Sequence, residues 1–313
     1  MLNTVTVTVP GTTSNVGPGF DCLGAAFTLR NEFRFTRLEG QTSCQIAILK
    51  TDPGVIPTGR QDLIQLDNNN LIYQAFLKAY EYLEQSPPSV RIDMQVRVPF
   101  SRGLGSSATA IVGGLVGANA LAGSPLTQDE LMTMAIAIEG HPDNVVPALL
   151  GGCRLAASDA THDWTICDVA WNADVIPVVA IPDFEVSTEA ARRILPKEYS
   201  RADAIFNMAH LGLLLRGLET GREDWLRSAL QDRIHQPYRQ SLITGFEAVQ
   251  SAAIAAGAYG LVISGAGPTL LALTNSASAS TVAIALSTAW SQQGISVQTK
   301  ILQVDPQGAK VEG

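Results

Sequence analysis

The feature that most constrains the fold of this 313-residue chain is a glycine-rich turn between a strand-like and a helix-like segment. Residues 89–98 alternate between apolar and polar side chains, as in a half-buried strand. Residues 107–121 are small and apolar almost throughout, as in a buried helix. The turn contains GLGSSA at residues 103–108, so backbone N–H groups and the positive end of a helix dipole converge there. This arrangement predicts an anion-binding loop.

The spacing separates this loop from the commoner phosphate-binding motifs. No Gly-Lys-Ser/Thr follows it, as a Walker A loop requires, and the pattern G-x-G-x-x-G fails at Ala108, which excludes the dinucleotide and protein-kinase loops. The hydroxyls of Ser106 and Ser107 can bond phosphate oxygens or Mg²⁺, and Arg102 can add positive charge at the rim. The alternative is a plain tight turn that caps a buried helix.

Composition limits the classes of partner. Twenty-one basic against 29 acidic residues give a net charge of −8, which argues against broad binding to nucleic acid or to an anionic membrane. The four cysteines show no CxxC spacing, so free thiols are expected rather than disulfides or a metal site. The chain begins without a signal-peptide pattern and has no apolar run of membrane-spanning length. We therefore expect a cytoplasmic protein that meets any anionic ligand locally.

The remaining segments mix strands and helices without regular alternation, which favours an α+β fold over a doubly wound sheet. Strands are predicted at residues 5–9, 27–35, 44–49, 89–98, 153–157, 175–181, 260–264 and 270–274. Helices are predicted at residues 70–84, 107–121, 125–139, 202–219 and 237–256, before a final helix and strand that end near residue 304. A soft boundary between residues 150 and 190 suggests two domains, 1–155 and 156–313.

Three other segments carry side chains suited to binding. In PGTTSNVGPGFD at residues 10–21, Asn15 can hydrogen-bond a hydroxyl and Asp21 can pair with an ammonium group. EGHPDN at residues 139–144 brings a carboxylate, an imidazole and an amide into one turn, at a spacing unlike that of HExxH or a facial triad. SGAGPT at residues 264–269 has glycines that permit close backbone approach. Taken alone, each segment could also be an ordinary loop or hairpin.

The glycine-rich loop and these three segments, in this order, resemble the signature of the GHMP kinases, named for galactokinase, homoserine, mevalonate and phosphomevalonate kinases. The resemblance implies an N-terminal domain of the ribosomal S5 domain 2 type, with a left-handed βαβ unit, and a ferredoxin-like C-terminal domain. It also implies that ATP and Mg²⁺ bind. The residues that it assigns to ATP are Asn70, Pro99, Ser101, Arg102, Gly103, Leu104, Gly105, Ser106, Ser107 and Ala108.

Within this superfamily the chain most resembles the homoserine kinases, which phosphorylate the side-chain hydroxyl of L-homoserine in threonine biosynthesis. Residues 14–21 resemble their N-terminal motif, and residues 187–196 and 231–239 resemble the segments that supply two arginines to the substrate carboxylate. The implied substrate-binding residues are Asn15, Asp21, His141, Asn144, Arg192, Arg239 and Gly265, and the catalytic candidates are Asn15, Asp21 and Thr188.

The implied metal ligands are Ser106 and Glu139. Many homoserine kinases have a second glutamate two residues earlier, where this chain has Ala137, so Glu139 is the only acidic candidate. The resemblance also implies a homodimer. Two alternatives stay open: another GHMP kinase, for mevalonate or isopentenyl phosphate, and a non-catalytic nucleotide-binding relative. If Arg192 and Arg239 face the phosphate loop, another GHMP kinase is disfavoured. Turnover of ATP would argue against a non-catalytic relative.

Overall fold

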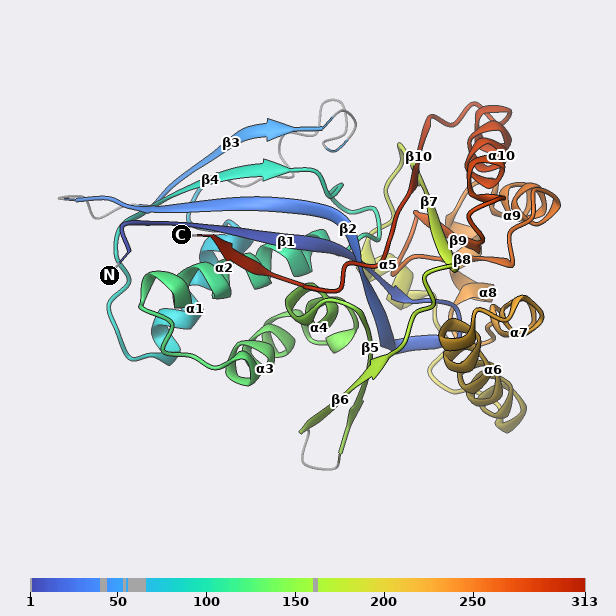
Figure 1. The fold of residues 1–313 in the computed structure, drawn as a ribbon, viewed down its shortest axis with the longest axis horizontal. Helices are drawn as coiled ribbons and strands as arrows, with labels where there is room; N and C mark the ends of the chain where they lie inside the picture. The colour runs from blue at the N-terminus through green and yellow to red at the C-terminus, as the bar shows by residue number, and fades with distance from the viewer. Residues whose placement is uncertain (1, 40–43, 53–54, 56–65, 160–162, 313) are drawn as a thin grey trace.

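The computed structural model of the protein describes residues 2–39, 44–52, 55, 66–159 and 163–312. Two β-sheets form the framework, one built mainly by the N-terminal half of the chain and one by the C-terminal half, and helices pack on each (Figure 1). This is the mixed α+β architecture that the sequence predicted. Within the described residues, no helix has both the length and the apolar character needed to cross a membrane.

The first sheet is dominated by a long antiparallel pair, β1 and β2. Burial alternates along the first residues of β1 and then becomes continuous, because the far end of the strand lies between the two halves of the molecule. The strand order is β11-β1-β2-β4-β3, and β5 and β6 extend from β2. Its strands are β1 (Thr4–Asn15), β2 (Gly19–Arg37), β3 (Gln45–Thr51), β4 (Val90–Val96), β5 (Cys153–Ser158), β6 (Trp164–Val169) and β11 (Lys310–Glu312).

Four helices cover one face of this sheet (Figure 1). They are α1 (Leu71–Tyr82), α2 (Ser106–Leu121), α3 (Gln128–Glu139) and α4 (Pro142–Leu150). Gly113 and Gly117 let the apolar α2 lie close against β2. A Cβ at either position would come within 2.5 Å of the ring of Phe33 or Phe35. A capping box of Thr127 and Glu130 begins α3. This packing holds the start of α2 at the end of the sheet that faces the second half.

The strands β3 and β4 pair in parallel, and α1 connects them, so this part of the chain forms a βαβ unit. The second sheet is antiparallel throughout, with the order β10-β7-β9-β8. If these four strands are numbered by their order along the chain, their order in the sheet is 4-1-3-2, which is that of a ferredoxin-like βαββαβ unit. Its strands are β7 (Ile176–Pro182), β8 (Gly260–Ile263), β9 (Leu270–Thr274) and β10 (Val297–Ile301).

The helices of the second half differ widely in length. The longest, α6, continues into α7, and α9 and α10 pack against the second sheet around the buried Trp290. The described helices are α5 (Thr188–Arg193), α6 (Arg201–Thr220), α7 (Glu223–Ala229), α8 (Gln236–Arg239), α9 (Phe246–Ala255) and α10 (Ala279–Ser291), with a 3₁₀ turn at Gln240–Leu242.

The chain crosses between the halves twice. It leaves the first sheet after β6, and the final strand β11 returns to pair with β1. The predicted boundary after residue 155 lies inside β5, which pairs with β2 and so continues the first sheet. The division into two domains remains a proposal, and the sheets favour a boundary after β6.

One prediction about an individual element was wrong, and one predicted strand is longer than expected. The helix predicted over residues 237–256 is interrupted, because Ile243 is extended and Gly245 adopts φ +80°, so α9 begins only at Phe246. The strand predicted over residues 27–35 begins earlier, at Gly19, because the small residues that precede it pair with β1 and β5.

Candidate active site

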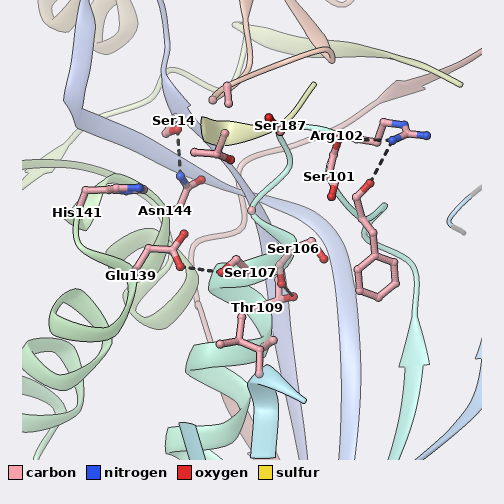
Figure 2. Close-up of a pocket in the computed structure, with 18 of the residues that line it drawn as sticks. Ser14, Ser101, Arg102, Ser106, Ser107, Thr109, Glu139, His141, Asn144 and Ser187 are labelled. Carbon is pink, nitrogen blue, oxygen red and sulfur yellow. Dashed lines mark hydrogen bonds between the residues drawn. The ribbon is translucent and has the colours of Figure 1, made fainter. Parts of the chain in front are cut away.

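A cavity of about 460 Å³ lies where the two halves meet. It is lined by the turn between β1 and β2, the start of α1, the glycine-rich loop, the turn between α3 and α4, the start of α5 and the loop after β8. The four sequence segments singled out for binding therefore converge on one site, part of which is drawn in Figure 2.

The glycine-rich loop has the local geometry of an anion cradle. Gly103 and Gly105 adopt φ values of +77° and +67°, which favour glycine. A Cβ on Gly103 would lie 2.2 Å from the carbonyl oxygen of Ser264, and one on Gly105 would lie 2.0 Å from Oγ1 of Thr12. Gly105 is the N-cap of α2, and no side chain caps this helix. The first N–H groups of α2 are thus left to the cavity, which Ser106 and Ser107 line.

Not every residue assigned to ATP lines the cavity with its side chain. Leu104 and Ala108 are buried, and Leu104 packs in the apolar core with Val16 of the turn between β1 and β2. Pro99 does not line the cavity, whereas Ser101, Ser106 and Ser107 do. Among the residues of the loop, backbone groups and hydroxyls therefore form the inner surface.

Arg102 differs most from its predicted place at the phosphate rim. Its side chain is 3% exposed, and its guanidinium donates to the carbonyl oxygens of Pro182 and Asp183, at 3.0 Å each, beside Glu185. In Figure 2 the side chain extends away from Ser106 and Ser107. The guanidinium thus ties the loop to the end of β7, and the prediction of a phosphate-facing charge was wrong.

Glu139, at the end of α3, faces the loop. Its Oε2 accepts a hydrogen bond of 2.8 Å from Oγ of Ser107 (Figure 2). Burial raises the pKa of Glu139, and the bond from Ser107 and the charge of His141 oppose that rise. One desolvated carboxylate beside hydroxyls and open backbone N–H groups fits Mg²⁺, which binds through one or two carboxylates together with substrate phosphates. Among the described residues no three acidic, histidine or cysteine side chains cluster as an all-protein metal site.

The turn between α3 and α4 contains a pair that the sequence reasoning missed. Nδ1 of His141 lies 2.7 Å from Oδ1 of Asp143, which is buried. The hydrogen bond that His141 donates to Asp143 raises the pKa of His141. Asn144 accepts from Thr12 and donates to Ser14, so it joins this turn to β1 (Figure 2). Asp143 follows a proline at the start of α4, where an acidic residue is common in the first turn of a helix. Its pairing with His141 was therefore not apparent from the sequence.

The turn between β1 and β2 has an unusual backbone. Asn15, Val16 and Asp21 have φ values of +70°, +45° and +57°, which non-glycine residues seldom adopt. The amide of Asn15 holds the turn: Oδ1 accepts from the backbone N–H of Asp21, and Nδ2 donates to the carbonyl oxygen of Gly265, both at 2.9 Å. Most of the hydrogen-bonding capacity of the Asn15 amide is thus used by partners within the protein.

Asp21 and Arg192 form a two-pronged ion pair across the cavity. Both carboxylate oxygens of Asp21 accept from the guanidinium of Arg192 at 3.0 Å, and each side chain is about one-third exposed. Arg192 lies in α5, and Thr188 at the start of this helix also lines the cavity. The sequence reasoning placed both charges in the site but did not foresee that they bind each other.

Arg239 reaches the same region from α8 and is buried. Its Nε donates to the carbonyl oxygen of Ala191, and Nη1 donates to that of Gly265. Burial lowers the pKa of Arg239, and the charge of Asp21 opposes this change. The other terminal nitrogen, Nη2, has no hydrogen-bond partner within the part of the chain that the structure describes.

The far end of the cavity is largely apolar. Asn70 lines it, and its side chain accepts from the N–H of Ile72 at 3.0 Å, so it also caps α1. The alternation of apolar and polar residues in β2 and β4 does not distinguish, from sequence, the apolar residues that line this cavity from ordinary core residues. Those that line it are Phe33, Ile72, Met94, Val96 and Phe100.

Known proteins match this chain along its whole length. Sequence models of the GHMP kinase N-terminal and C-terminal domains match residues 70–152 and 214–292. The homoserine kinase of Trichormus variabilis is 60% identical over 309 residues, which cover 99% of each chain. That of Synechococcus sp. is 54% identical and covers 98% of each chain.

Solved structures agree. The crystal structure of homoserine kinase from Cytophaga hutchinsonii has a TM-score of 0.87 at 30% identity and covers 100% of this chain and 98% of that one. L. major mevalonate kinase, at 16% identity and a TM-score of 0.72, covers 96% and 95% and shares the fold. The chain is therefore a GHMP kinase. Within that superfamily it belongs to the homoserine kinases.

Proposed function

We propose that this chain transfers the γ-phosphoryl group of ATP to the side-chain hydroxyl of L-homoserine, which yields O-phospho-L-homoserine and ADP. The observation that carries the proposal is the ion pair of Asp21 and Arg192, which places opposite charges beside an uncapped helix N-terminus, with Arg239 nearby. An α-amino acid offers an ammonium and a carboxylate, so it can satisfy both charges while its hydroxyl points toward the phosphate loop.

The phosphate groups of ATP are proposed to bind at the start of α2. The N–H groups of residues 103–108 and the hydroxyls of Ser106 and Ser107 supply donors, and the helix dipole favours negative charge there. The apolar far end of the cavity, next to Asn70, suits a flat base. Phosphoryl transfer depends mainly on position and charge neutralisation, which such a rigid cradle provides.

Ser106 and Glu139 are the proposed metal-site residues, and Ser107 lies beside them because its Oγ donates to Glu139. Bound Mg²⁺ would neutralise phosphate charge. Oε2 of Glu139 accepts a hydrogen bond of 2.8 Å from Oγ of Ser107, which holds the carboxylate against the glycine-rich loop. Because Ala137 stands where many homoserine kinases have a second glutamate, Glu139 is the one acidic residue proposed for this site.

At the substrate end, Asp21 is proposed to bind the ammonium, and Arg192 and Arg239 the carboxylate. Asn15 has one amide proton left to orient the substrate hydroxyl, because its other groups bond Asp21 and Gly265. When the hydroxyl oxygen bonds to phosphorus and the bond to ADP breaks, the hydroxyl proton must leave. Asp21 and Thr188 are the candidates to receive it. His141 and Asn144 complete the wall of the pocket.

The test is an assay of ADP release by the purified protein with homoserine, threonine, mevalonate and a panel of sugars. We expect a clear preference for homoserine. A preference for mevalonate or a sugar would contradict the proposed substrate, and ATP binding without turnover would favour a non-catalytic relative.

We further propose a homodimer in the cytoplasm. All four cysteines are free thiols, which supports a reducing compartment. Light scattering coupled to size-exclusion chromatography measures the mass directly. A mass near that of one 33.2 kDa chain would contradict the dimer.

A further inference from the structure

A buried carboxylate organises the segment that carries Arg239. Asp232 lies just before α8, and its oxygens accept hydrogen bonds from the backbone N–H groups of Ile234, His235 and Gln236, at 3.1, 2.8 and 2.7 Å. They also accept from Nδ2 of Asn207 in α6, at 2.7 Å. These four bonds satisfy the carboxylate and fix the start of α8 against α6.

His235 is fully buried in this segment and touches both parts of the substrate site. Its Nε2 lies 2.9 Å from the carbonyl oxygen of Gly17, which belongs to the turn that carries Asn15 and Asp21. Its Nδ1 lies 3.5 Å from Nη1 of Arg239. The imidazole therefore stands between the proposed ligands of the ammonium and a proposed ligand of the carboxylate.

The two partners of His235 define its tautomer. A carbonyl oxygen only accepts hydrogen bonds, so Nε2 must carry the proton. A guanidinium only donates, so Nδ1 must present its lone pair to Arg239. The neutral Nε2–H form is the one state that satisfies both contacts, because a proton on Nδ1 would face the N–H donor of Arg239, and in the imidazolium two positive charges would also face each other.

Burial and the charge of Arg239 favour this neutral state, whereas the carboxylates of Asp232 and Asp21 oppose it. Arg239 faces it, Oδ2 of Asp232 lies 3.7 Å from Nε2, and Asp21 is the next acidic group of the site. Burial lowers the pKa of His235, while Asp232 opposes the change and Arg239 reinforces it. Phe20 stacks on His235 at 5.2 Å between ring centroids and also lies 5.1 Å below the guanidinium carbon of Arg239.

We infer that His235 is a positioning residue for amino-acid recognition: its neutral Nε2–H tautomer ties the turn bearing Asn15 and Asp21 to Arg239 and so sets the spacing between the ammonium and carboxylate partners. The inference deepens the proposed function, since it takes the substrate to be an α-amino acid. It concerns one end of the cavity alone. The phosphate loop makes no hydrogen bond to His235 in the part of the chain that the structure describes.

The kinetic test compares His235→Asn with His235→Gln. Asparagine is too short to reach the carbonyl oxygen of Gly17, whereas the amide of glutamine can place an N–H where Nε2 lies. Losing one buried hydrogen bond predicts that His235→Asn raises KM for homoserine about tenfold and changes KM for ATP by less than about twofold. His235→Gln recovers most of the loss. His210→Gln, at a half-buried position of α6 that does not line the cavity, is the matched control and leaves both constants unchanged.

A second measurement needs no substrate and so separates this inference from the proposed function. Imidazole ¹⁵N spectra distinguish the two neutral tautomers from the imidazolium, and the signal absent from His235→Gln identifies His235 among the four histidines. We expect the neutral Nε2–H form between about pH 6 and about pH 8. An Nδ1–H tautomer or an imidazolium at neutral pH would overturn the inference, as would a parallel rise in KM for ATP in His235→Asn. The spectra decide the question even if homoserine is not turned over or if His235→Asn does not fold.

Discussion

The two ends of the cavity are built in different ways. The phosphate end is one short stretch, residues 101–107, whose backbone and hydroxyls form the surface at the start of α2. The substrate end is assembled from four distant segments, with Asp21, Arg192, Arg239 and Gly265 joined by hydrogen bonds across the two halves. In the proposed assignment, local backbone geometry binds the phosphate, whereas recognition of the amino acid depends on how the halves are held together.

The largest expected effect breaks the phosphate end. In Gly103→Ala, the φ of +77° is strained and the new Cβ would lie 2.2 Å from the carbonyl oxygen of Ser264. The loop must shift, so kcat/KM for ATP should fall roughly a hundredfold or more in steady-state assays. Gly123→Ala is the matched control, because it has φ +93° and nothing within 4 Å, and it should retain activity. Equal losses in both variants would contradict the proposed role of the loop.

The next effect isolates the substrate end. Asp21→Asn removes the charge that pairs with Arg192 and, in our proposal, with the substrate ammonium. Charged hydrogen bonds contribute about 1.5–3 kcal/mol, so KM for homoserine should rise about thirtyfold while KM for ATP stays within about twofold. Asp174→Asn, at an exposed acid that does not line the cavity, is the control. A comparable rise in both Michaelis constants would show that the two ends are not separate.

A smaller effect is expected where the two ends meet. Glu139→Gln should raise the Mg²⁺ concentration that gives half-maximal rate by about tenfold, because one charged oxygen ligand is lost. Burial raises the pKa of Glu139, so as the pH falls its carboxylate takes up a proton earlier than an ordinary glutamate does. In the unmodified protein the Mg²⁺ concentration needed for half-maximal rate should therefore begin to rise at a higher pH than an ordinary glutamate ligand would give. An unchanged Mg²⁺ titration in Glu139→Gln would remove Glu139 from the metal site.

The smallest effect concerns stability. Asp143 raises the pKa of His141, so the pair stabilises the fold below the ordinary histidine pKa of 6.5 and loses this contribution as the pH rises through the raised value. His141→Gln should therefore reduce the free energy of unfolding by less than about 1 kcal/mol, and more at about pH 5.5 than at about pH 9. Urea unfolding at both pH values measures this. In an Asp143→Asn background the pH dependence should vanish, and its persistence would assign it to another group.

The same contrast explains what could be predicted from the sequence. The phosphate loop was recognisable because glycine spacing, a preceding strand and an apolar helix are adjacent in the chain. Both arginines and Asp21 were located by their motifs, but their pairing was not predicted, because a bond between Asp21 and Arg192 depends on how distant segments pack. Arg102 was misplaced for the same reason: its carbonyl partners lie at the end of β7.

Some parts of the fold carried too little local signal. β11 is a three-residue exposed strand that exists only because it pairs with β1, and β6 only extends the hairpin with β5. The break before α9 rests on Gly245, whose positive φ is set by its surroundings. The roles of Asp232 and His235 were not apparent from the sequence, although an acid three residues before a histidine can indicate a carboxylate that accepts from the backbone N–H groups at a helix start.

The most direct test of the account compares kcat/KM for L-homoserine with that for aminopropanol, which lacks the carboxylate, and γ-hydroxybutyrate, which lacks the ammonium. If Asp21 and the two arginines clamp the substrate, each analogue should react at least about a hundredfold more slowly than homoserine, with KM for ATP unchanged. Comparable kcat/KM values for homoserine and either analogue would contradict the proposal that the two halves recognise an amino acid between them.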